Sequence, residues 1–346
     1  MAGLGLIGGS IALALREHGW HVTGDDLDPT RIERALALGA VDAPGFDRTA
    51  DVTFVATPVL AIVDQVKRAL TDSTGLVTDV GSVKGGITAA IDDPRFVGGH
   101  PMAGSELDGF DGADASMFEG AVWVLTPSSA TADSTFSQVA AVVAELGADV
   151  VALPADRHDQ VVAVISHVPH LAAATLMGLA SDRAEEHAAL LRLAAGGFRD
   201  MTRIASGHPS IWLDICAENR PAILSALDGL IDGLASMRDV VDRDDRDALY
   251  DRLQHAREAR VNLPSRVNQP SELAEVRIPI PDRPGAAAEV FTLAAELGVN
   301  IASFEVVHSV EGNRGVAVVL VDVATAELYR GGLMASGYRP AVQRLA

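Results

Sequence analysis

The chain opens with a glycine pattern that strongly limits how it can fold. Gly3-Leu4-Gly5-Leu6-Ile7-Gly8 matches G-x-G-x-x-G, which in α/β proteins forms a tight turn before a helix and lets the backbone approach a pyrophosphate. We expect that helix over Ile11–His18. A strand is predicted at His21–Gly24 and ends in Asp25-Asp26, where an acid would bind the ribose hydroxyls of a dinucleotide. Such an acid repels a 2′-phosphate, so the pattern favours NAD over NADP, although Arg31 leaves NADP open.

The strand that should lead into this turn is expected to be missing or a stub, because only Met1 and Ala2 precede Gly3. A sheet without its first strand would expose unpaired edges and hold the phosphate loop poorly. The predicted cofactor-binding residues belong to the turn, to the acid and to the turn after the second strand: Gly3, Gly5, Leu6, Ile7, Gly8, Asp26, Thr57 and Pro58.

Hydrophobic periodicity divides the chain into four segments. Residues 1–150 alternate short apolar strands with amphipathic helices, which is typical of βαβ units in a Rossmann-type, doubly wound parallel sheet. Residues 151–258 show long helical periods and no credible strand, and 259–270 are predicted to be a linker. Residues 271–346 have the βαββαβ order of a ferredoxin-like module. The strands predicted are His21–Gly24, Val52–Ala56, Leu76–Val80, Phe96–Gly98, Ala121–Thr126, Val276–Ile280, Ile301–His308, Val316–Val323 and a short last strand; the helices of the last module are Gly285–Leu297 and Thr325–Ala335.

Composition excludes several classes of protein. A net charge of −20 over 346 residues argues against a nucleic-acid partner, whose phosphates require a basic face. No apolar run reaches the roughly 18 residues that span a bilayer, and no export signal is present, so we expect no membrane partner. Cys216 is the only cysteine, which rules out a disulfide framework and indicates the cytoplasm.

A histidine between glycines is the first candidate for chemistry. His100 follows the predicted strand Phe96–Gly98. In open α/β sheets, ligands bind outside the carboxyl ends of the strands. Imidazole is the side chain whose ordinary pKa lies nearest neutrality, so it suits the removal of a proton from an alcohol being oxidised. The alternative is that His100 merely caps a turn.

Two further polar groups lie in the helical segment. His167 and His170 are three residues apart and therefore share a helix face, and Pro169 should kink that helix. Near its start, the Asp159 carboxylate could orient the neighbouring imidazole of His158 or pair with a cation. The His-x-x-His pair has no third ligand or nearby glutamate, so no metal site is predicted.

The segment Gly197–Arg203 carries an arginine, Arg203, whose planar fork suits a carboxylate substrate. The alternatives are a surface salt bridge for the arginine and satisfied core positions for His167 and His170.

Five segments in this order resemble the prephenate dehydrogenases of tyrosine biosynthesis. They are Gly3–Ser10, Asp79–Lys84, Gly98–Glu106, Ser166–His170, and Phe198–Arg203 followed by Trp212. The last module, with Asp282–Gly285 before its first helix and Leu297–Ile301 after it, resembles an ACT domain, a module that binds amino acids for feedback control.

The resemblance implies NAD-dependent oxidative decarboxylation of prephenate to 4-hydroxyphenylpyruvate, CO2 and NADH. It also implies that the helical segment makes a homodimer, which agrees with the apolar face of Ile223–Leu234, and that tyrosine is a candidate effector at the ACT domain. By the same resemblance His100 takes the proton of the ring hydroxyl, and Ser82 orients that hydroxyl and His100.

The remaining roles follow from the same resemblance. Arg203 would clamp a substrate carboxylate, His170 the pyruvyl side chain, and Glu106 would gate the pocket. His167 and Trp212 would lie near the substrate, although a core position for Trp212 is an open alternative. The supporting residues are His158, Asp159 and Lys84.

Three other functions remain open. An arogenate dehydrogenase would differ only in the substrate side chain. A non-catalytic amino-acid sensor would keep the ACT module and lose NAD, and another NAD-dependent reductase would not require the His100, His170 and Arg203 arrangement.

Overall fold

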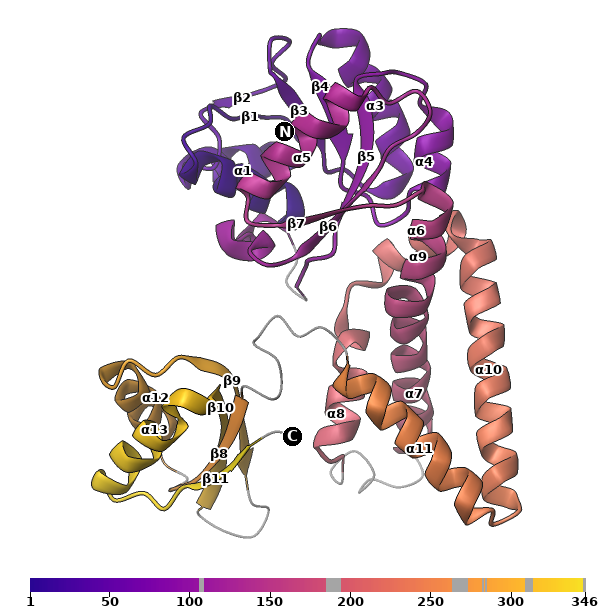
Figure 1. Cartoon of the computed structure of the whole chain (residues 1–346). Helices are drawn as coiled ribbons and strands as arrows, with labels where there is room; N and C mark the ends of the chain where they lie inside the picture. Colours follow the sequence, from indigo (N-terminus) through magenta and orange to yellow (C-terminus); the bar gives the residue numbers. More distant parts are fainter. Residues whose placement is uncertain are drawn as a thin grey trace. The chain divides into compact units, whose positions relative to one another are not determined.

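The computed structural model describes residues 1–105, 109–184, 194–262, 273–281, 283, 285–308 and 314–344. The chain forms two compact units, Met1–Arg238 and Asp239–Ala346, and Figure 1 labels their helices and strands.

The first unit is built on a five-stranded sheet. Its strands lie in the order β3 (Val52–Val55), β4 (Leu76–Asp79), β5 (Phe96–Pro101), β6 (Val122–Thr126), β7 (Asp149–Ala152). The pairs β3–β4 and β4–β5 are parallel, as predicted, whereas β6 runs antiparallel to β5 and parallel to β7. Strand β7 was not predicted, because its residues are largely exposed and so lack an apolar pattern.

Helices cover both faces of this sheet (Figure 1). Successive residues of a strand point to opposite faces, and in β3 Phe54 packs in one apolar cluster while Val55 packs in another. Ile11 and Val139 belong to the cluster of Phe54, and Ile62 to the other. The sheet is therefore buried on both sides, as in a doubly wound fold. Its helices are α1 (Leu6–Glu17), α2 (Pro29–Ala37), α3 (Val59–Asp72), α4 (Gly85–Ala90) and α5 (Asp133–Glu145).

The strand expected before the glycine turn is reduced to a stub at Ala2, as predicted. Strands β1 (Thr23–Gly24) and β2 (Ala43–Pro44) form a separate parallel pair, and Ala2 makes single parallel bridges to both Asp25 and Val55. The Ala2 amide donates to the Phe54 carbonyl at 2.9 Å, and the Gly3 amide donates to that of Asp25 at 2.8 Å. These bonds connect the β1–β2 pair to the main sheet just before the glycine turn.

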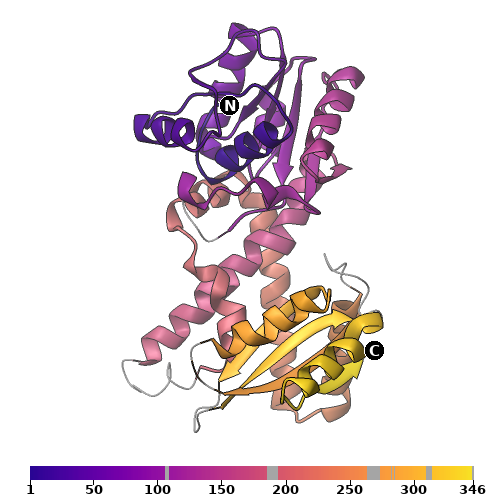
Figure 2. The same cartoon turned by 90° about the vertical axis from the view of Figure 1, so that its left-hand side faces the viewer.

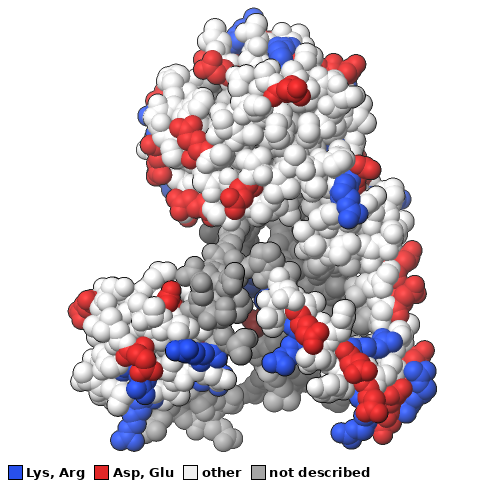
Figure 3. All heavy atoms as spheres, viewed as in Figure 1, with Lys and Arg blue, Asp and Glu red and all other residues white. Residues whose placement is uncertain are grey.

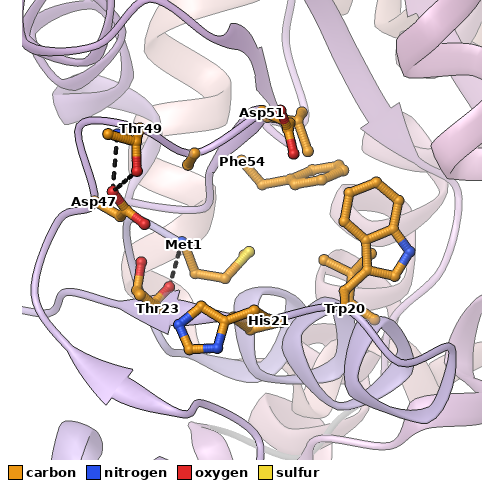
Figure 4. Close-up of a pocket in the computed structure, with 12 residues that line it drawn as sticks. Met1, Trp20, His21, Thr23, Asp47, Thr49, Asp51 and Phe54 are labelled. Atoms are coloured by element: carbon orange, nitrogen blue, oxygen red, sulfur yellow. Dashed lines mark hydrogen bonds between the residues drawn. The ribbon is translucent and has the colours of Figure 1, made fainter.

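A pocket of about 160 Å³ lies where β1 and β3 begin. Figure 4 shows the Met1 side chain pointing into it, with Trp20 and Phe54 on the other side. The Met1 amino group donates to the Thr23 carbonyl at 2.7 Å. The pocket is thus at the amino ends of the strands, opposite the edge at which α/β sheets bind their ligands.

The rest of the first unit is helical in its described residues. The chain passes through α6 (Ala155–Val162), the π-helical turn η3 (Ala163–His167) and α7 (Val168–Ala184). Pro169 has no amide to donate to the carbonyl four residues before it. The Val168 amide bonds instead to the carbonyl of Ala163, five residues back, so the predicted kink takes the form of a π turn. The remaining elements are α8 (Gly196–Thr202), the 3-10 turn η5 (Arg203–Ser206), α9 (Pro209–Glu218) and α10 (Arg220–Asp242).

One described helix, Ala155–Asp182, is long and apolar enough to cross a membrane by length and composition alone, with a mean hydropathy of 1.6. The sequence-based count missed it because an average over a window tolerates the polar residues that interrupt an apolar run. Core helices of proteins outside membranes pass the same test, and this helix buries the polar side chains of His158 and His167.

The second unit contains the predicted βαββαβ module. Its antiparallel sheet has the order β11-β8-β10-β9, and α12 and α13 lie on one face of it (Figure 2). Val276, Val319 and Tyr329 are buried between sheet and helices. The elements are β8 (Leu273–Pro281), α12 (Ala286–Glu296), β9 (Ile301–His308), β10 (Arg314–Asp322), α13 (Val323–Ala335) and β11 (Ala341–Arg344).

Helix α11 (Arg246–Val261) also belongs to the second unit and extends into the segment predicted as a linker. Residues 263–270 of that segment lie outside the described residues. On the face seen in Figure 3, the Lys and Arg side chains of the described residues are interspersed with Asp and Glu and form no continuous basic surface.

Candidate active site

His100 lies near the end of β5, beyond the last residue that this strand pairs with β4. The parallel pairing ends at Thr78 and Val97, but β5 continues because β6 pairs with it antiparallel, His100 opposite Val124. The prediction that the strand ends at Gly98 is therefore wrong. His100 is held by strand geometry at the carboxyl edge of the sheet, where ligands of open α/β sheets bind.

The His100 imidazole begins a chain of hydrogen-bonding groups. Its Nδ1 is 2.8 Å from Nε2 of His158, and Nδ1 of His158 is 2.8 Å from Oδ1 of Asp159. The Asp159 carboxylate also accepts the backbone amides of Lys84 and Gly85, each at 2.8 Å. His158 is fully buried. The structure thus brings together the candidate base and two candidate supporting residues that the sequence singled out.

A buried ion pair lies next to this chain. The Lys84 ammonium contacts the carboxylate of Asp79 and donates to the Gly99 carbonyl at 2.8 Å, and both charged side chains are fully buried. Asp79 accepts the amide of Gly81 at 2.8 Å. Burial lowers the pKa of Lys84, and the Asp79 charge opposes that shift. The pair ties the end of β4 to the backbone beside His100.

The surroundings of His100 favour its neutral form. Burial is the main cause that lowers the pKa of His100 well below its ordinary value, and electrostatic interactions with His158 and with the Lys84 ammonium lower it further. An imidazole in this setting is unprotonated at neutral pH, so it can accept a proton from a ligand in the crevice.

A second cluster lies around Trp212 in α9. The His170 ring stacks on the indole with 3.6 Å between centroids and 14° between planes, and the His167 ring meets it edge-on at 6.1 Å. Asn219 Nδ2 lies 3.2 Å from Nδ1 of His167 and donates to the backbone carbonyl of Asp159 at 2.9 Å. Asn219 therefore links this cluster to the His100 chain. Burial lowers the pKa of His167 to about 4.

Two other predicted site residues lie nearer the protein surface. Ser82 is partly exposed on the loop after β4, and Arg203 is exposed at the start of η5. Gly207, just after η5, approaches both His170 and Trp212. Glu106 lies outside the described residues.

Sequence reasoning missed Asp79 and Asn219. Asp79 ends an apolar strand within a segment that carried the family resemblance, and a carboxylate there requires a partner. Asn219 ends helix α9 just before the proline-containing start of α10, so it resembles an ordinary helix end. The described residues contain no group of three side chains that could hold a metal ion.

The glycine turn forms a cradle of backbone atoms. Gly3 has φ +94°, and a Cβ added there would lie 2.4 Å from the carbonyl oxygen of Ala56. A Cβ added to Gly8 would lie 2.1 Å from the carbonyl oxygen of Gly3. Gly5 faces open space. Helix α1 begins at Leu6, not at Ile11 as predicted. Gly8 and Gly9 are part of its first turns, and their missing side chains let the helix approach Gly3 and Phe110 closely. The first-turn amides, including those of Leu6, Ile7 and Gly8, are thus available to an anion.

The rest of the turn also fits a dinucleotide. Asp26 follows β1, and its carboxylate accepts the amides of Leu4 at 2.7 Å and Asp28 at 2.9 Å. Arg31 approaches the same carboxylate at 3.7 Å. The Thr57 hydroxyl, just before Pro58, is buried without a hydrogen-bond partner. Since buried hydroxyls are normally satisfied, a hydrogen-bonding partner from a bound dinucleotide would fit this position.

Comparisons with known proteins identify the family of the chain. Residues 11–152 match the model "Prephenate dehydrogenase, nucleotide-binding domain", and residues 154–255 match "Prephenate dehydrogenase, dimerization domain". The chain is 33% identical to the prephenate dehydrogenase of Bacillus subtilis over 91% of its own length and 90% of that protein.

The chain is also similar to solved structures of prephenate and arogenate dehydrogenases. Prephenate dehydrogenase from Aquifex aeolicus, in complex with hydroxyphenyl propionate and NAD+, superposes with a TM-score of 0.72 at 30% identity, covering 76% of this chain and 96% of that one. Synechocystis arogenate dehydrogenase superposes with a TM-score of 0.66 at 31% identity, covering 75% and 97%. The chain therefore belongs to the prephenate dehydrogenase family.

Proposed function

We infer that this chain is an NAD-dependent prephenate dehydrogenase, which converts prephenate to 4-hydroxyphenylpyruvate and CO2. The observation that carries this inference is His100, an imidazole at the carboxyl edge of the sheet whose pKa is held well below its ordinary value by burial. A base at this place serves the oxidation of a secondary alcohol.

The residues divide the reaction between them. When bound, NAD supplies the acceptor for the hydride that leaves the ring carbon bearing the hydroxyl. His100 takes the hydroxyl proton, and Ser82 orients that hydroxyl. The ring carboxylate needs no acid to leave, because formation of an aromatic ring drives its loss as CO2. The ring oxygen then takes back the proton held by His100, which gives the phenol and restores the neutral base.

The substrate side is formed by the helical segment. Arg203 pairs with a substrate carboxylate, for which its planar fork is suited, and His170 binds the pyruvyl side chain against the indole of Trp212. His167 supports this wall from the buried side, and Glu106 gates the pocket. His158, Asp159 and Lys84 support His100 through the hydrogen bonds described above.

The cofactor side is formed by the glycine turn. The amides of Leu6, Ile7 and Gly8 bind the pyrophosphate, and Gly3 and Gly5 allow its close approach. Asp26 binds the ribose hydroxyls, which favours NAD over NADP. Thr57 and Pro58 line the same crevice, with the free hydroxyl of Thr57 as a donor.

The chain acts as a homodimer made by its helical segment. Apolar side chains on three helices are more than half exposed in the single chain: Leu179, Leu213, Leu224, Ile231 and Leu234. Apolar surface of this extent is typical of an interface. Light scattering should show a dimer, and a monomer at micromolar concentration would contradict this.

Three further points complete the proposal. The domain division is 1–150, 151–258, a linker at 259–270, and 271–346. The last of these is an ACT module with tyrosine as the candidate effector. Cys216 is the only cysteine in the sequence, which supports a reducing, cytoplasmic setting.

The substrate is tested by comparing kcat/KM for prephenate and arogenate, following NADH at 340 nm. We expect prephenate to be preferred. A preference for arogenate beyond tenfold, about 1.4 kcal/mol of transition-state binding, would reverse the assignment. Calorimetry with NAD addresses the sensor alternative, since a sensor would show no binding at millimolar cofactor.

A further inference from the structure

We propose that Asp159 and His158 are positioning residues that hold the His100 proton on Nδ1, so that Nε2 of His100 faces the substrate as a lone pair. Neither residue needs to touch the substrate. The proposal rests on the proposed function, because it concerns the base of that reaction, but its structural half can be tested without substrate.

The argument begins at the buried carboxylate. Asp159 receives three hydrogen bonds, from the amides of Lys84 and Gly85 and from His158. Burial acts to raise the pKa of Asp159, but the bonds from His158 and the two amides outweigh it and lower that pKa. Asp159 is therefore an anion, and an ionised carboxylate only accepts hydrogen bonds.

The carboxylate determines the proton on His158. Its Nδ1, 2.8 Å from Asp159 Oδ1, must donate, since a lone pair there would face an anionic acceptor. In a neutral imidazole the other nitrogen is then an acceptor. Nε2 of His158 lies 2.8 Å from Nδ1 of His100, so Nδ1 of His100 must carry a proton. The lone pair of His100 is left on Nε2.

The same chain supports the step that follows. The substrate O–H bond breaks, and the proton forms an N–H bond at Nε2 of His100, which becomes an imidazolium. The Nδ1–H of that cation points to His158 and, through it, to the Asp159 anion. An oriented carboxylate stabilises an imidazolium formed in this way, as in the Ser-His-Asp arrangement.

Nitrogen NMR tests the proton position directly. The full-length protein is labelled with 15N-histidine, and the chemical shifts of each ring show which nitrogen is protonated. The signals of His100 are assigned by their loss in His100→Asn. We expect Nδ1–H in the wild type without substrate, and a mixture of both tautomers in His158→Phe, which has no acceptor.

Kinetics of matched variants separate positioning from general support. His158→Phe should lower kcat by roughly ten- to a hundredfold, with KM for prephenate and Kd for NAD changed less than twofold. His158→Gln places an amide oxygen near the position of Nε2, so it should keep the Nδ1–H tautomer and recover part of kcat. Gln160→Ala, an exposed position on the same helix, is the control and should change nothing.

Two results would overturn the proposal. One is a wild-type His100 protonated on Nε2. The other is a folded His158→Phe variant that keeps a single Nδ1–H tautomer and at least a third of kcat. Should the wild type fail to oxidise prephenate, the proposed function fails, while the tautomer measurement still decides the hydrogen-bond chain.

Discussion

The buried ion pair beside the site gives a stability prediction that follows from geometry. Lys84→Met removes the ammonium that contacts Asp79 and holds the Gly99 carbonyl. It leaves the Asp79 carboxylate fully buried without its counter-charge. Breaking a buried pair on one side costs about 3–5 kcal/mol. We expect the lower end, about 3 kcal/mol, because the Gly81 and Gly99 amides still donate to Asp79 and hydrogen bonds to a charged group offset part of the cost.

The expected change in Tm follows from this loss of stability and from the number of residues in the folded unit. Unit Met1–Arg238 should unfold with an entropy of roughly 500 cal/mol/K, from about 2.1 cal/mol/K per residue. A loss of about 3 kcal/mol then lowers Tm by about 6 °C. Tryptophan fluorescence reports this unit, since Trp20, Trp123 and Trp212 all lie in it.

Two variants make the interpretation specific. Lys67→Met removes an exposed lysine and should change stability by less than about 0.5 kcal/mol. Adding Asp79→Asn to Lys84→Met removes the uncompensated charge but keeps an acceptor for Gly81, so it should recover about 1 kcal/mol or more. If Lys84→Met alone stays within about 1 kcal/mol of the wild type, the reasoning about the buried pair is refuted.

Three other outcomes are expected. Arg203→Ala should raise KM for prephenate about tenfold or more with little change in kcat, because it removes a charge-assisted contact; an unchanged KM places the clamp elsewhere. In the folded state the pKa of His167 is about 4, whereas that of an unfolded histidine is 6.5. Between pH 6.5 and pH 4 only the unfolded chain binds a proton at this residue. The free energy of unfolding therefore falls as the pH is lowered through this range. The loss reaches about 3 kcal/mol by pH 4, and His167→Asn should flatten the urea-unfolding profile over that range. Asp26→Asn should raise kcat/KM with NADP relative to NAD by about tenfold, and an unchanged ratio would show that Asp26 does not select the cofactor.

Local patterns predicted much of the fold. The strand–helix alternation gave the sheet segments of the first unit and the βαββαβ order of the second, because each element has its own apolar period. The sequence patterns did not predict strand β7 or the antiparallel direction of β6. An exposed strand has little period, and strand direction is set by pairing between distant segments.

In the candidate site, too, local sequence patterns predicted some residues, whereas residues that act through distant contacts were not predicted. Histidines in unusual sequence settings predicted His100, His158 and His170 as candidates, and the structure places His158 next to His100. Two partners did not stand out, Asp79 and Asn219, because each acts across a contact between separate elements. The π turn before Pro169 follows from the missing amide of that proline, but the choice between a kink and a wider turn depends on the packing around it.

The most direct measurement of the central claim is NADH formation at 340 nm with prephenate and NAD, for the wild type and for His100→Asn. We expect the wild type to turn over and the variant to lose roughly two to four decades of kcat with KM nearly unchanged, since a base acts in the transition state. A variant that retains more than a third of wild-type turnover would contradict the assignment of His100 as the base.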